Sequence, residues 1–538
     1  MTYLLFPGRH LLNTCFQEQY LHGVLAAAPG AQPGLKRGQM VPGAPITQIV
    51  FAITSSNQAN SRYNPVPFYI RAIGVDRFAR SLKASAPFSI FGIPHYGHTA
   101  SFADFTIKEI ADQSEGLIRL SPSNCLVLCS TPAVIELYQK LGYSILTAEQ
   151  THPGVPTPIE LVREVAVHGD GWQASGLLKD QLATASRSLL KDFPEVTRRI
   201  TRLYNDPLVN QEGSLTEKRN YNTYARGMNE IIRLKYLDIC EAIRPGRIVD
   251  EGCADGALLA EISQGFPDSD LYGIDLSAEF ADRFEERRRA GDFGGSYVHF
   301  FLRNLLNPVF EPESIDTTIC NSTLHELWSY ANGGSSVRDY LKEKYRQLRR
   351  GGRLVIRDVV GPDHAEETVL LWCNRGDGKP SDRTDPTILE DRTETILSQL
   401  STEDRFYLFV RDFLRNKPKR KAELVHYQQI EMEERTFFRL SRRLAGEFLS
   451  KKDYIDNWNS ETNEEFCFWD FTRWKQELAE IGFQVVETFS HPTQGSRVYC
   501  NPWTVEHRYK GSVELRQDSA PHQLLEFPPT NMVLVAEK

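Results

Sequence analysis

Val249-Asp250-Glu251-Gly252-Cys253-Ala254-Asp255-Gly256 is the stretch that decides the fold of the second half of the chain. It closes an apolar run over 247–251 that predicts a strand, and it opens a run with helical spacing. Glycines at such a turn let the backbone approach a ligand at the helix start, where N–H groups are unpaired. Asp275 ends the next predicted strand, where a carboxylate can accept both hydroxyls of a ribose. The pattern predicts a site for an adenosine-type cofactor; a purely structural turn is the alternative.

Predicted strands alternate with helices along most of the chain, which predicts parallel sheets with helices on both faces. In the second half we expect strands over 247–251, 271–275, 296–303, 315–320 and 353–358. In the first half we expect them over 3–6, 46–53, 88–93 and 125–129. The strand signal is absent from about 169 to 242. We therefore expect an α/β fold with two doubly wound, Rossmann-like domains joined by a helical connector.

The expected domain boundaries follow from where the strand signal stops and resumes. A long segment with helical spacing and dense charge interrupts the second domain before its last helix and strands. We predict an α/β domain over 1–168, a helical connector over 169–220, a cofactor-binding core over 221–360, a helical insertion or lid over 361–469, and the C-terminal helix and strands of the core over 470–538.

Composition limits the class of protein. The 538 residues carry 62 Lys and Arg against 70 Asp and Glu, a net charge of −8, and 41% are hydrophobic. This excludes a single small module and a generally basic nucleic-acid surface; the basic run 411–421 leaves a local nucleic-acid contact as an unfavoured alternative. Apolar runs stay below about 18 residues, and a Pro-Gly turn at 7–8 interrupts the first. We therefore predict no association with membranes.

The nine cysteines are scattered and form no Cys-x-x-Cys pair. Cys125 and Cys129 flank an apolar run, a pattern typical of buried thiols rather than of a zinc site. We therefore predict a cytoplasmic location, reduced cysteines and no bound metal ion.

Residues 221–360 and 470–538 resemble the class I S-adenosylmethionine-dependent methyltransferases. The family's first-strand motif, Asp-x-Gly-x-Gly-x-Gly, is matched at Asp250, Gly252 and Gly256, with alanine in place of the middle glycine. Further segments resemble the family in order: the second strand at 271–275, the turn before the fifth strand at 348–356 and the turn before the final strands at 482–483. A dinucleotide-dependent dehydrogenase would share the first turn but not the closing helix and late strands. The resemblance implies S-adenosylmethionine as cofactor and a small-molecule or nucleotide-like methyl acceptor.

The resemblance also implies a set of cofactor-binding residues at the ends of the first four strands. Arg303 and Asn304 stand where the family places its adenine contact; an asparagine that caps the strand end is the alternative. The full set comprises Asp250, Glu251, Gly252, Cys253, Ala254, Gly256, Asp275, Leu276, Arg303, Asn304 and Asn321.

The segment 321–328 follows the fourth strand and should face the transferred methyl group, because parallel sheets bind ligands beyond the carboxyl ends of their strands. It lacks the Asn/Asp-Pro-Pro-Tyr signature of family members that methylate base amines. His325 or Glu326 could take a proton from the acceptor. Alternatively, His325 caps a helix and Glu326 points to water. Tyr224 and Arg357 are further candidates for contact with the acceptor.

Residues 1–168 resemble the nucleotidyltransferase superfamily, in particular nicotinamide mononucleotide adenylyltransferases. The resemblance is carried by Phe6-Pro7-Gly8-Arg9, by Asn64-Pro65-Val66-Pro67 with Arg71, and by later segments in the family's order. The catalytic His/Thr-x-Gly-His element is degenerate, because alignment on Gly8-Arg9 places Phe16 and Gln17 at its glycine and second histidine. A literal His95-Tyr96-Gly97-His98 follows the third predicted strand instead. Four nucleotide- or substrate-binding candidates result: Gly8, Arg9, His95 and His98.

Three functions remain open. The favoured one is a methyltransferase whose N-terminal domain binds a nucleotide with reduced or lost transferase activity. A bifunctional enzyme would combine nucleotidyl transfer with methyl transfer, and it would release pyrophosphate from a nucleoside triphosphate. A binding protein that senses the cofactor would bind it without turnover.

Overall fold

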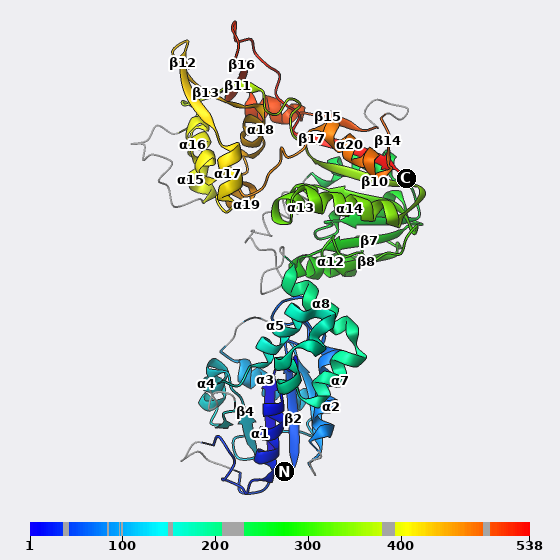
Figure 1. Ribbon diagram of the computed structural model, residues 1–538, viewed down its shortest axis with the longest axis vertical. Helices are drawn as coiled ribbons and strands as arrows, with labels where there is room; N and C mark the ends of the chain where they lie inside the picture. Colours follow the sequence, from blue (N-terminus) through cyan, green and yellow to red (C-terminus); the bar gives the residue numbers. More distant parts are fainter. Residues whose placement is uncertain are drawn as a thin grey trace. The chain divides into compact units, whose positions relative to one another are not determined.

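The computed structural model divides into two compact units, residues 1–214 and 215–538 (Figure 1). Two of the candidate site residues, His98 and Tyr224, lie outside the residues that it describes. The described residues are 1–35, 42–82, 86–95, 97, 100–148, 154–206, 231–378, 393–487 and 495–538.

The first unit is built on a parallel five-stranded sheet with the order β3-β2-β1-β4-β5. The strands are β1 (Tyr3–Gly8), β2 (Gln48–Thr54), β3 (Phe88–Ile93), β4 (Cys125–Leu128) and β5 (Ser144–Leu146). Helices α1 (Cys15–Ala26) and α2 (Phe68–Ser81) pack on one face, and α3 (Phe102–Gln113) and α4 (Pro132–Lys140) pack on the other. Both faces of the central strands are buried, which explains their continuous apolar runs. The predicted parallel α/β fold is confirmed.

Four further helices complete the first unit: α5 (Pro158–His168), α6 (Gly176–Gln181), α7 (Thr184–Asp192) and α8 (Pro194–Asn205). Their apolar faces share one core with α2, formed around Ile70, Val162, Leu189 and Ile200. The helices that the spacing predicts after residue 169 are therefore present. The described helices of the expected connector nevertheless pack into the first unit, because their buried leucines and isoleucines find partners on α2 and α5.

The second unit contains a larger sheet with the order β14-β17-β10-β9-β6-β7-β8. Strands β6 to β10 are parallel, and β17 runs antiparallel to β10, β14 and β15. The bounds are β6 (Arg247–Glu251), β7 (Asp270–Asp275), β8 (Val298–Leu302), β9 (Ile315–Asn321), β10 (Leu348–Val359), β14 (Gln484–Val485), β15 (Arg497–Tyr499) and β17 (Asn531–Glu537). The five predicted parallel strands of this half are thus present.

Helices cover both faces of this sheet. On one face α10 (Ile232–Ile239), α11 (Ala257–Gly265) and α12 (Ala278–Ala290) share a core with the strands. A second group contacts one another and lies in front of the sheet in Figure 1: α13 (Leu324–Tyr330), α14 (Gly334–Gln347) and α20 (Phe471–Ile481). The carboxyl ends of β6, β7, β8 and β9 meet at one edge, where the predicted site residues are concentrated.

The segment 361–469 is not the purely helical insertion that its charge pattern predicts. It contributes β11 (Thr368–Cys373), β12 (Tyr427–Met432) and β13 (Arg435–Ser441) to an antiparallel sheet with the order β12-β13-β11-β16. The fourth strand, β16 (Val513–Gln517), comes from beyond the last helix of the core, so no local pattern could reveal the pairing. We call residues 361–469 together with 500–525 the accessory subdomain.

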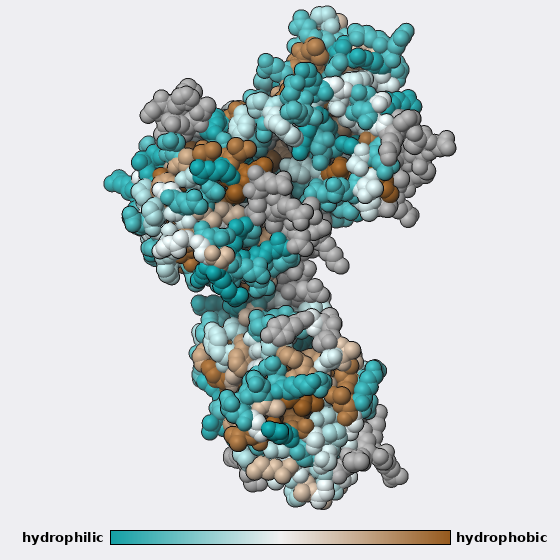
Figure 2. Space-filling model, turned by 180° about the vertical axis from the view of Figure 1, so that it is seen from behind, coloured by the Kyte–Doolittle hydropathy of each residue, from teal (hydrophilic) through white to brown (hydrophobic). Residues whose placement is uncertain are grey.

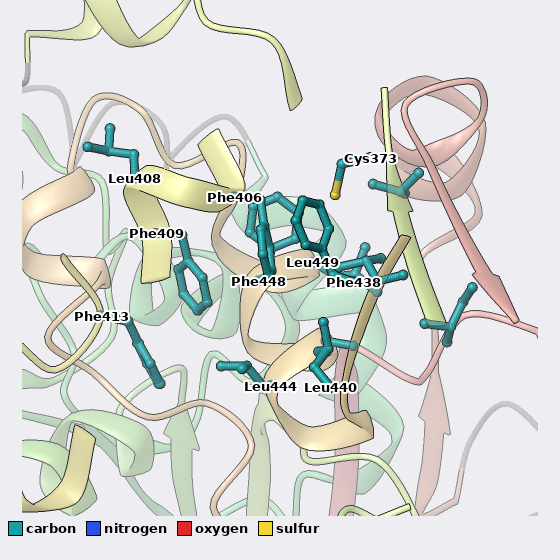
Figure 3. Packing of buried hydrophobic residues seen from close by; sticks show 14 of the residues in the cluster. Cys373, Phe406, Leu408, Phe409, Phe413, Phe438, Leu440, Leu444, Phe448 and Leu449 are labelled. Carbon is teal, nitrogen blue, oxygen red and sulfur yellow. The ribbon is translucent and has the colours of Figure 1, made fainter. Parts of the chain in front are cut away.

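Aromatic packing holds the accessory subdomain together (Figure 3). The ring of Phe406 stacks on Phe438 at 4.1 Å between centroids and meets Phe448 edge-on at 5.2 Å. The described helices that contribute to this core are α15 (Glu394–Leu397), α16 (Thr402–Asp412), α17 (Pro418–Leu424), α18 (Arg442–Lys451) and α19 (Trp458–Glu461). A short helix α21 (Pro502–Thr504) continues into a π-helical turn, Val505–Tyr509.

Hydrophilic side chains cover most of the face shown in Figure 2, and apolar ones gather there in small patches. The exposed large apolar side chains include Leu234 and Leu237 of α10 and Trp503. Among the described residues, no helix combines the length and the hydropathy that a membrane span requires.

Candidate functional site

The turn between β6 and α11 requires its glycines. Gly252 has φ +77° and Gly256, the N-cap of α11, has φ +81°. A Cβ at Gly252 would overlap Oγ1 of Thr323, and one at Gly256 would lie 2.6 Å from the ring of Phe284. Ala254 also has a positive φ, +47°. The backbone can therefore follow this path only with glycine at two positions.

Asp275 joins this turn to the next strand–helix connection. Its Oδ2 accepts the N–H of Ala254 at 3.0 Å, and its Oδ1 accepts the N–H of Ser277 at 2.9 Å. Burial raises the pKa of Asp275 to about 6, and the carboxylate of Glu326 adds to the rise, although the backbone N–H groups oppose it. Each oxygen of an ionised carboxylate can accept a further hydrogen bond, so both remain able to accept ribose hydroxyls.

Asp250 is a buried carboxyl group with an unused acceptor. Among the described residues, nothing hydrogen-bonds to its Oδ1. Burial raises the pKa of Asp250 to about 8, the carboxylates of Asp275 and Glu251 raise it further, and Lys235 lowers it. Such an atom is costly unless a ligand donates to it. The amino group of a methionine moiety is a donor of the right charge, so this residue fits S-adenosylmethionine.

Glu251, predicted among the cofactor residues, is engaged elsewhere. Its carboxylate forms a buried ion pair with Lys344 of α14, whose Nζ also donates to Oε1 of Gln347 at 3.0 Å. Neighbouring side chains on a strand point to opposite faces. Because Asp250 belongs to the face covered by α10, Glu251 lies on the face covered by α14, and its contacts there favour a structural role.

The remaining predicted cofactor residues lie at the same edge of the sheet. The backbone N–H of Arg303 donates to the carbonyl of Asp275 at 2.7 Å, which fixes the end of β8 beside β7. Asn304 is buried, and its Oδ1 accepts the N–H of Leu306 at 2.9 Å, the strand-end cap that was the alternative to adenine binding. Buried Cys253, half-buried Leu276 and buried Asn321 complete the set at the ends of β6, β7 and β9.

His325 is held between two carboxylates. Its Nδ1 lies 2.6 Å from Oδ1 of Asp358, and its Nε2 lies 3.4 Å from Oε2 of Glu464 in the accessory subdomain. Burial by itself would lower the pKa of His325, but Asp358 and Glu464 outweigh it and raise this pKa well above its ordinary value. A protonated imidazole whose two nitrogens both face carboxylates cannot take a proton from an acceptor. This geometry favours a positioning role for His325.

Asp358 also fixes the start of the helix that carries His325. Its Oδ2 accepts the N–H groups of Thr323 at 3.2 Å and Leu324 at 2.7 Å, in the first turn of α13. Glu326 is half-buried and lies close enough to Asp275 for its carboxylate to raise the pKa of that residue. Adjacent helical residues point about 100° apart. His325 therefore faces the accessory subdomain, while Glu326 lies on the side of the cofactor residues.

Arg357, predicted to contact the acceptor, belongs to an ionic cluster. Its Nε donates to Oδ2 of Asp238 at 2.8 Å, and the same carboxylate accepts from Tyr499 at 2.9 Å and Arg497 at 3.0 Å. The cluster joins β10, α10 and β15, so the guanidinium is largely occupied by structural contacts.

Sequence reasoning missed Lys235 and Asp238, although α10 carries a signal for them. The helix buries Lys235, which is 2% exposed, beside Tyr236 and Ile239, whereas Leu234 is 63% and Leu237 is 53% exposed. Burial lowers the pKa of Lys235 to about 7. The available signal is the lysine and the aspartate three residues apart, which places both charges on one side of a helix.

In the first unit, the predicted residues lie at the carboxyl ends of the strands. Gly8 ends β1, and Nη1 of Arg9 donates to the carbonyl of Tyr63 at 3.0 Å. The backbone N–H of His95 donates to Oδ1 of Asn57 at 2.8 Å. Arg71, quoted above only for the resemblance, is fully buried and donates to backbone carbonyls after β1 and β2, including Arg9 at 3.0 Å.

Comparison with known proteins bears on the second unit. The model of a family described as a methyltransferase domain matches residues 249–356, the span from β6 to β10. No curated protein matches the sequence. The second unit therefore contains an S-adenosylmethionine-dependent methyltransferase domain, and S-adenosylmethionine is its cofactor.

Solved structures show a weaker likeness. A candidate O-methyltransferase from Nostoc punctiforme is 12% identical, with 59% of this chain and 58% of that chain covered and a TM-score of 0.29. An S-adenosylmethionine-dependent methyltransferase from Mesorhizobium loti is 14% identical, with 57% and 96% covered and a TM-score of 0.29. One from Methanosarcina mazei is 13% identical, with 55% and 92% covered and a TM-score of 0.27. At these scores the likeness assigns neither a substrate nor a site to this chain.

Proposed function

We propose that the second unit transfers the methyl group of S-adenosylmethionine to a nucleophilic atom of a small-molecule or nucleotide-like acceptor. The observation that carries the proposal is the unpaired buried oxygen of Asp250, beside a glycine turn and the carboxylate of Asp275. When bound, S-adenosylmethionine supplies a methyl group activated by a sulfonium. Asp250 accepts from its amino group, and Asp275 accepts from its ribose hydroxyls.

The chain's own residues would then align the acceptor and move its proton. Glu326, on the side of Asp275, is the candidate general base. His325 keeps α13 in place through Asp358 and Glu464, and so fixes where Glu326 points. Most of the rate increase in such a transfer comes from alignment and exclusion of water, since the sulfonium already carries the reactivity.

Calorimetry of the full chain with S-adenosylmethionine and S-adenosylhomocysteine tests the cofactor site. We expect micromolar binding by the wild type, loss of binding in Asp275→Ala and unchanged binding in Asp270→Ala. Asp270 is the matched control because it lies at the exposed, opposite end of β7. Equal binding by the Asp275→Ala variant would refute the proposed ribose contact.

An acceptor panel tests the role of Glu326, with S-adenosylhomocysteine formation as the readout. For any acceptor that turns over, Glu326→Gln should lower kcat by a factor of about 10² to 10⁴ if it removes a proton, with cofactor affinity retained. Full activity in this variant would assign the acceptor a proton-independent transfer and remove Glu326 from the mechanism. Binding without turnover across the panel would favour the alternative of a cofactor-sensing protein.

We further propose that residues 1–168 form a nucleotide-binding domain with reduced or lost transferase activity. Gln17, at the expected histidine position, instead closes a capping box of α1: its side chain accepts the N–H of Thr14 at 3.1 Å, and its own N–H donates to Oγ1 of Thr14 at 3.0 Å. Within the described ranges, neither Arg9 nor Arg71 forms an ion pair with a carboxylate, which leaves positive charge for a phosphate. Pyrophosphate release from nucleoside triphosphates would instead establish the bifunctional alternative.

A further inference from the structure

The accessory subdomain contains a cavity of about 370 Å³ that lies apart from the predicted cofactor residues. Its lining comes from four separate segments, after β11, at the start of α16, after α18 and at the π-helical turn. A volume of this size is within the usual range of small-molecule sites. The polar lining residues include Thr402, Arg405, Lys452, Asp453, His507 and Arg508.

The lining carries an excess of positive charge. Arg405, Lys452 and Arg508 face two carboxylates, Asp377 and Asp453, which leaves one positive charge in excess. Both oxygens of Asp377 are already engaged, by the N–H of Thr402 at 2.8 Å and its Oγ1 at 2.6 Å. The cavity is therefore electrostatically suited to an anion.

Lys452 and Arg405 share a single carboxylate. Lys452 is 2% exposed, and its Nζ lies 2.9 Å from Oδ2 of Asp453 and donates to the carbonyl of Arg508 at 2.7 Å. Arg405 lies 3.3 Å from Oδ1 of the same aspartate. A buried ammonium with half of a counter-ion is costly, and burial lowers the pKa of Lys452 accordingly. An added oxyanion would complete the charge balance.

Arg508 presents its charge to the cavity without an acidic partner. In the part of the chain that the structure describes, no carboxylate forms an ion pair with it. Its guanidinium lies over the ring of Trp503, 5.3 Å from the centroid, and Trp503 also contacts the ring of His507 at 4.9 Å. The residue stands on the π-helical turn, a conformation that occurs often at functional sites. The planar fork of an arginine matches the oxygens of a carboxylate or phosphate.

We propose that this cavity is a second ligand site, which binds a small molecule through a carboxylate or phosphate group held by Arg405, Lys452 and Arg508. A carboxylate and a phosphate both present negatively charged oxygens. The guanidinium and ammonium groups can donate hydrogen bonds to either. The site goes beyond the proposed methyl transfer, because its lining includes no residue from β6, β7, β8 or β9.

Calorimetry of the full chain tests the site, with inorganic phosphate and citrate as separate probes for the two oxyanion classes. We expect one of them to bind in the millimolar range or tighter. Arg508→Gln should weaken that binding by about tenfold or more, because it removes a charge-assisted hydrogen bond. Lys510→Gln is the matched control, since Lys510 is exposed and pairs with Glu506 of the same segment. It should bind like the wild type.

Thermal unfolding provides a second readout that does not depend on heats of binding. The effective anion should raise the Tm of the wild type and of Lys510→Gln but not that of Arg508→Gln. Retained S-adenosylmethionine binding in each variant would show that the core is intact. Absence of binding by both anions, equal binding in Arg508→Gln, or equal losses in both variants would overturn the proposal.

Discussion

The two units place similar strand–helix turns at the centre of parallel sheets, yet the turns differ in what they leave unpaired. After β6, two positive-φ glycines shape the turn, and Asp250 retains an unused acceptor. After β1, one buried donor, Nδ2 of Asn13, lacks a hydrogen-bond partner among the described residues, whereas other polar groups are engaged within the chain. His10 is buried, its Nε2 contacts the carbonyl of Phe6 at 3.0 Å, and burial lowers its pKa to about 4. Gln17 and Thr14 cap α1.

This difference shows that a shared fold does not by itself provide a ligand site. A doubly wound sheet offers a ligand crevice at the carboxyl ends of its strands, but a ligand is recognised there only by donors and acceptors that can still form a hydrogen bond. The turn after β6 has such groups. The match to the methyltransferase family begins at residue 249, in the strand that leads into this turn. In the turn after β1, Thr14 and Gln17, which stand where the catalytic element was expected, bond to each other at the start of α1.

The largest expected effect comes from adding a side chain at a glycine of the turn after β6. Gly252→Ala should abolish S-adenosylmethionine binding, because the new Cβ overlaps Thr323 and the φ of +77° is strained by about 1–3 kcal/mol. Gly291→Ala is the matched control, since Gly291 has φ +83° with open space around it. It should lose stability by about 1 kcal/mol and keep its cofactor affinity. Calorimetry and urea unfolding measure both variants.

The same substitution in the first unit sharpens the contrast. Gly8 does not have a positive φ, and its Cβ would lie 3.4 Å from the ring of His10. Gly8→Ala should therefore change the free energy of unfolding by less than about 1 kcal/mol. A loss as large as that of Gly252→Ala would contradict the distinction between the two turns.

His325→Gln removes the buried imidazolium. It should destabilise the second unit by about 3–5 kcal/mol, because Asp358 and Glu464 lose their shared cation. Because the folded pKa of His325 lies above its unfolded value, its contribution is complete below about pH 6.5 and disappears as the pH rises through the folded pKa. Urea unfolding across pH measures this. Glu464→Gln, which leaves Asp358 in place, should cost less; an equal or larger cost would contradict the proposed order.

Cofactor affinity should depend on the ionisation of Asp275. The pKa of this carboxyl group is about 6. Hydrogen bonds from ribose hydroxyls favour the ionised form, so the affinity should fall below this pH by at most about tenfold per pH unit. Calorimetry between mildly acidic and neutral pH would show the slope, and Asp275→Asn should flatten it. An unchanged slope in that variant would assign the dependence to another group.

A small effect is also expected from a second substitution near the turn after β1. Gln17→His should not create nucleotidyl transfer, and it should cost about 1 kcal/mol through the lost capping box. A pyrophosphate-release assay and urea unfolding check the two expectations. Appearance of transfer activity would show that the turn after β1 is open to nucleotides despite its internal hydrogen bonds.

Much of the core could be predicted because its signals are local. Buried parallel strands read as apolar runs, and the turn at 249–256 combines a strand end, glycines and a helix start within a few residues. The placement of Asp250 and Asp275 at one sheet edge follows from the parallel order of β6 and β7.

The rest depended on contacts between distant segments. The accessory sheet pairs β11 with β16, and the charged, exposed positions of β12 and β13 resemble a solvated helix in sequence. The sequence makes His325 a candidate general base, but the fold places Glu464 beside its Nε2. The sequence makes Glu251 a candidate cofactor residue, but the pleat of β6 directs its side chain toward Lys344. In each case, the contact that bears on the residue comes from a distant segment of the chain.

Proton release on cofactor binding tests most directly whether the turn after β6 is a ligand site centred on Asp250. Because the pKa of Asp250 is about 8, the free carboxyl group is largely protonated at neutral pH, and an ammonium group beside it would lower that pKa. Calorimetry with S-adenosylmethionine in buffers of different ionisation enthalpy should therefore show release of up to about one proton per chain, and none in Asp250→Asn. Binding by the wild type without proton release, or with the same release in Asp250→Asn, would contradict this account.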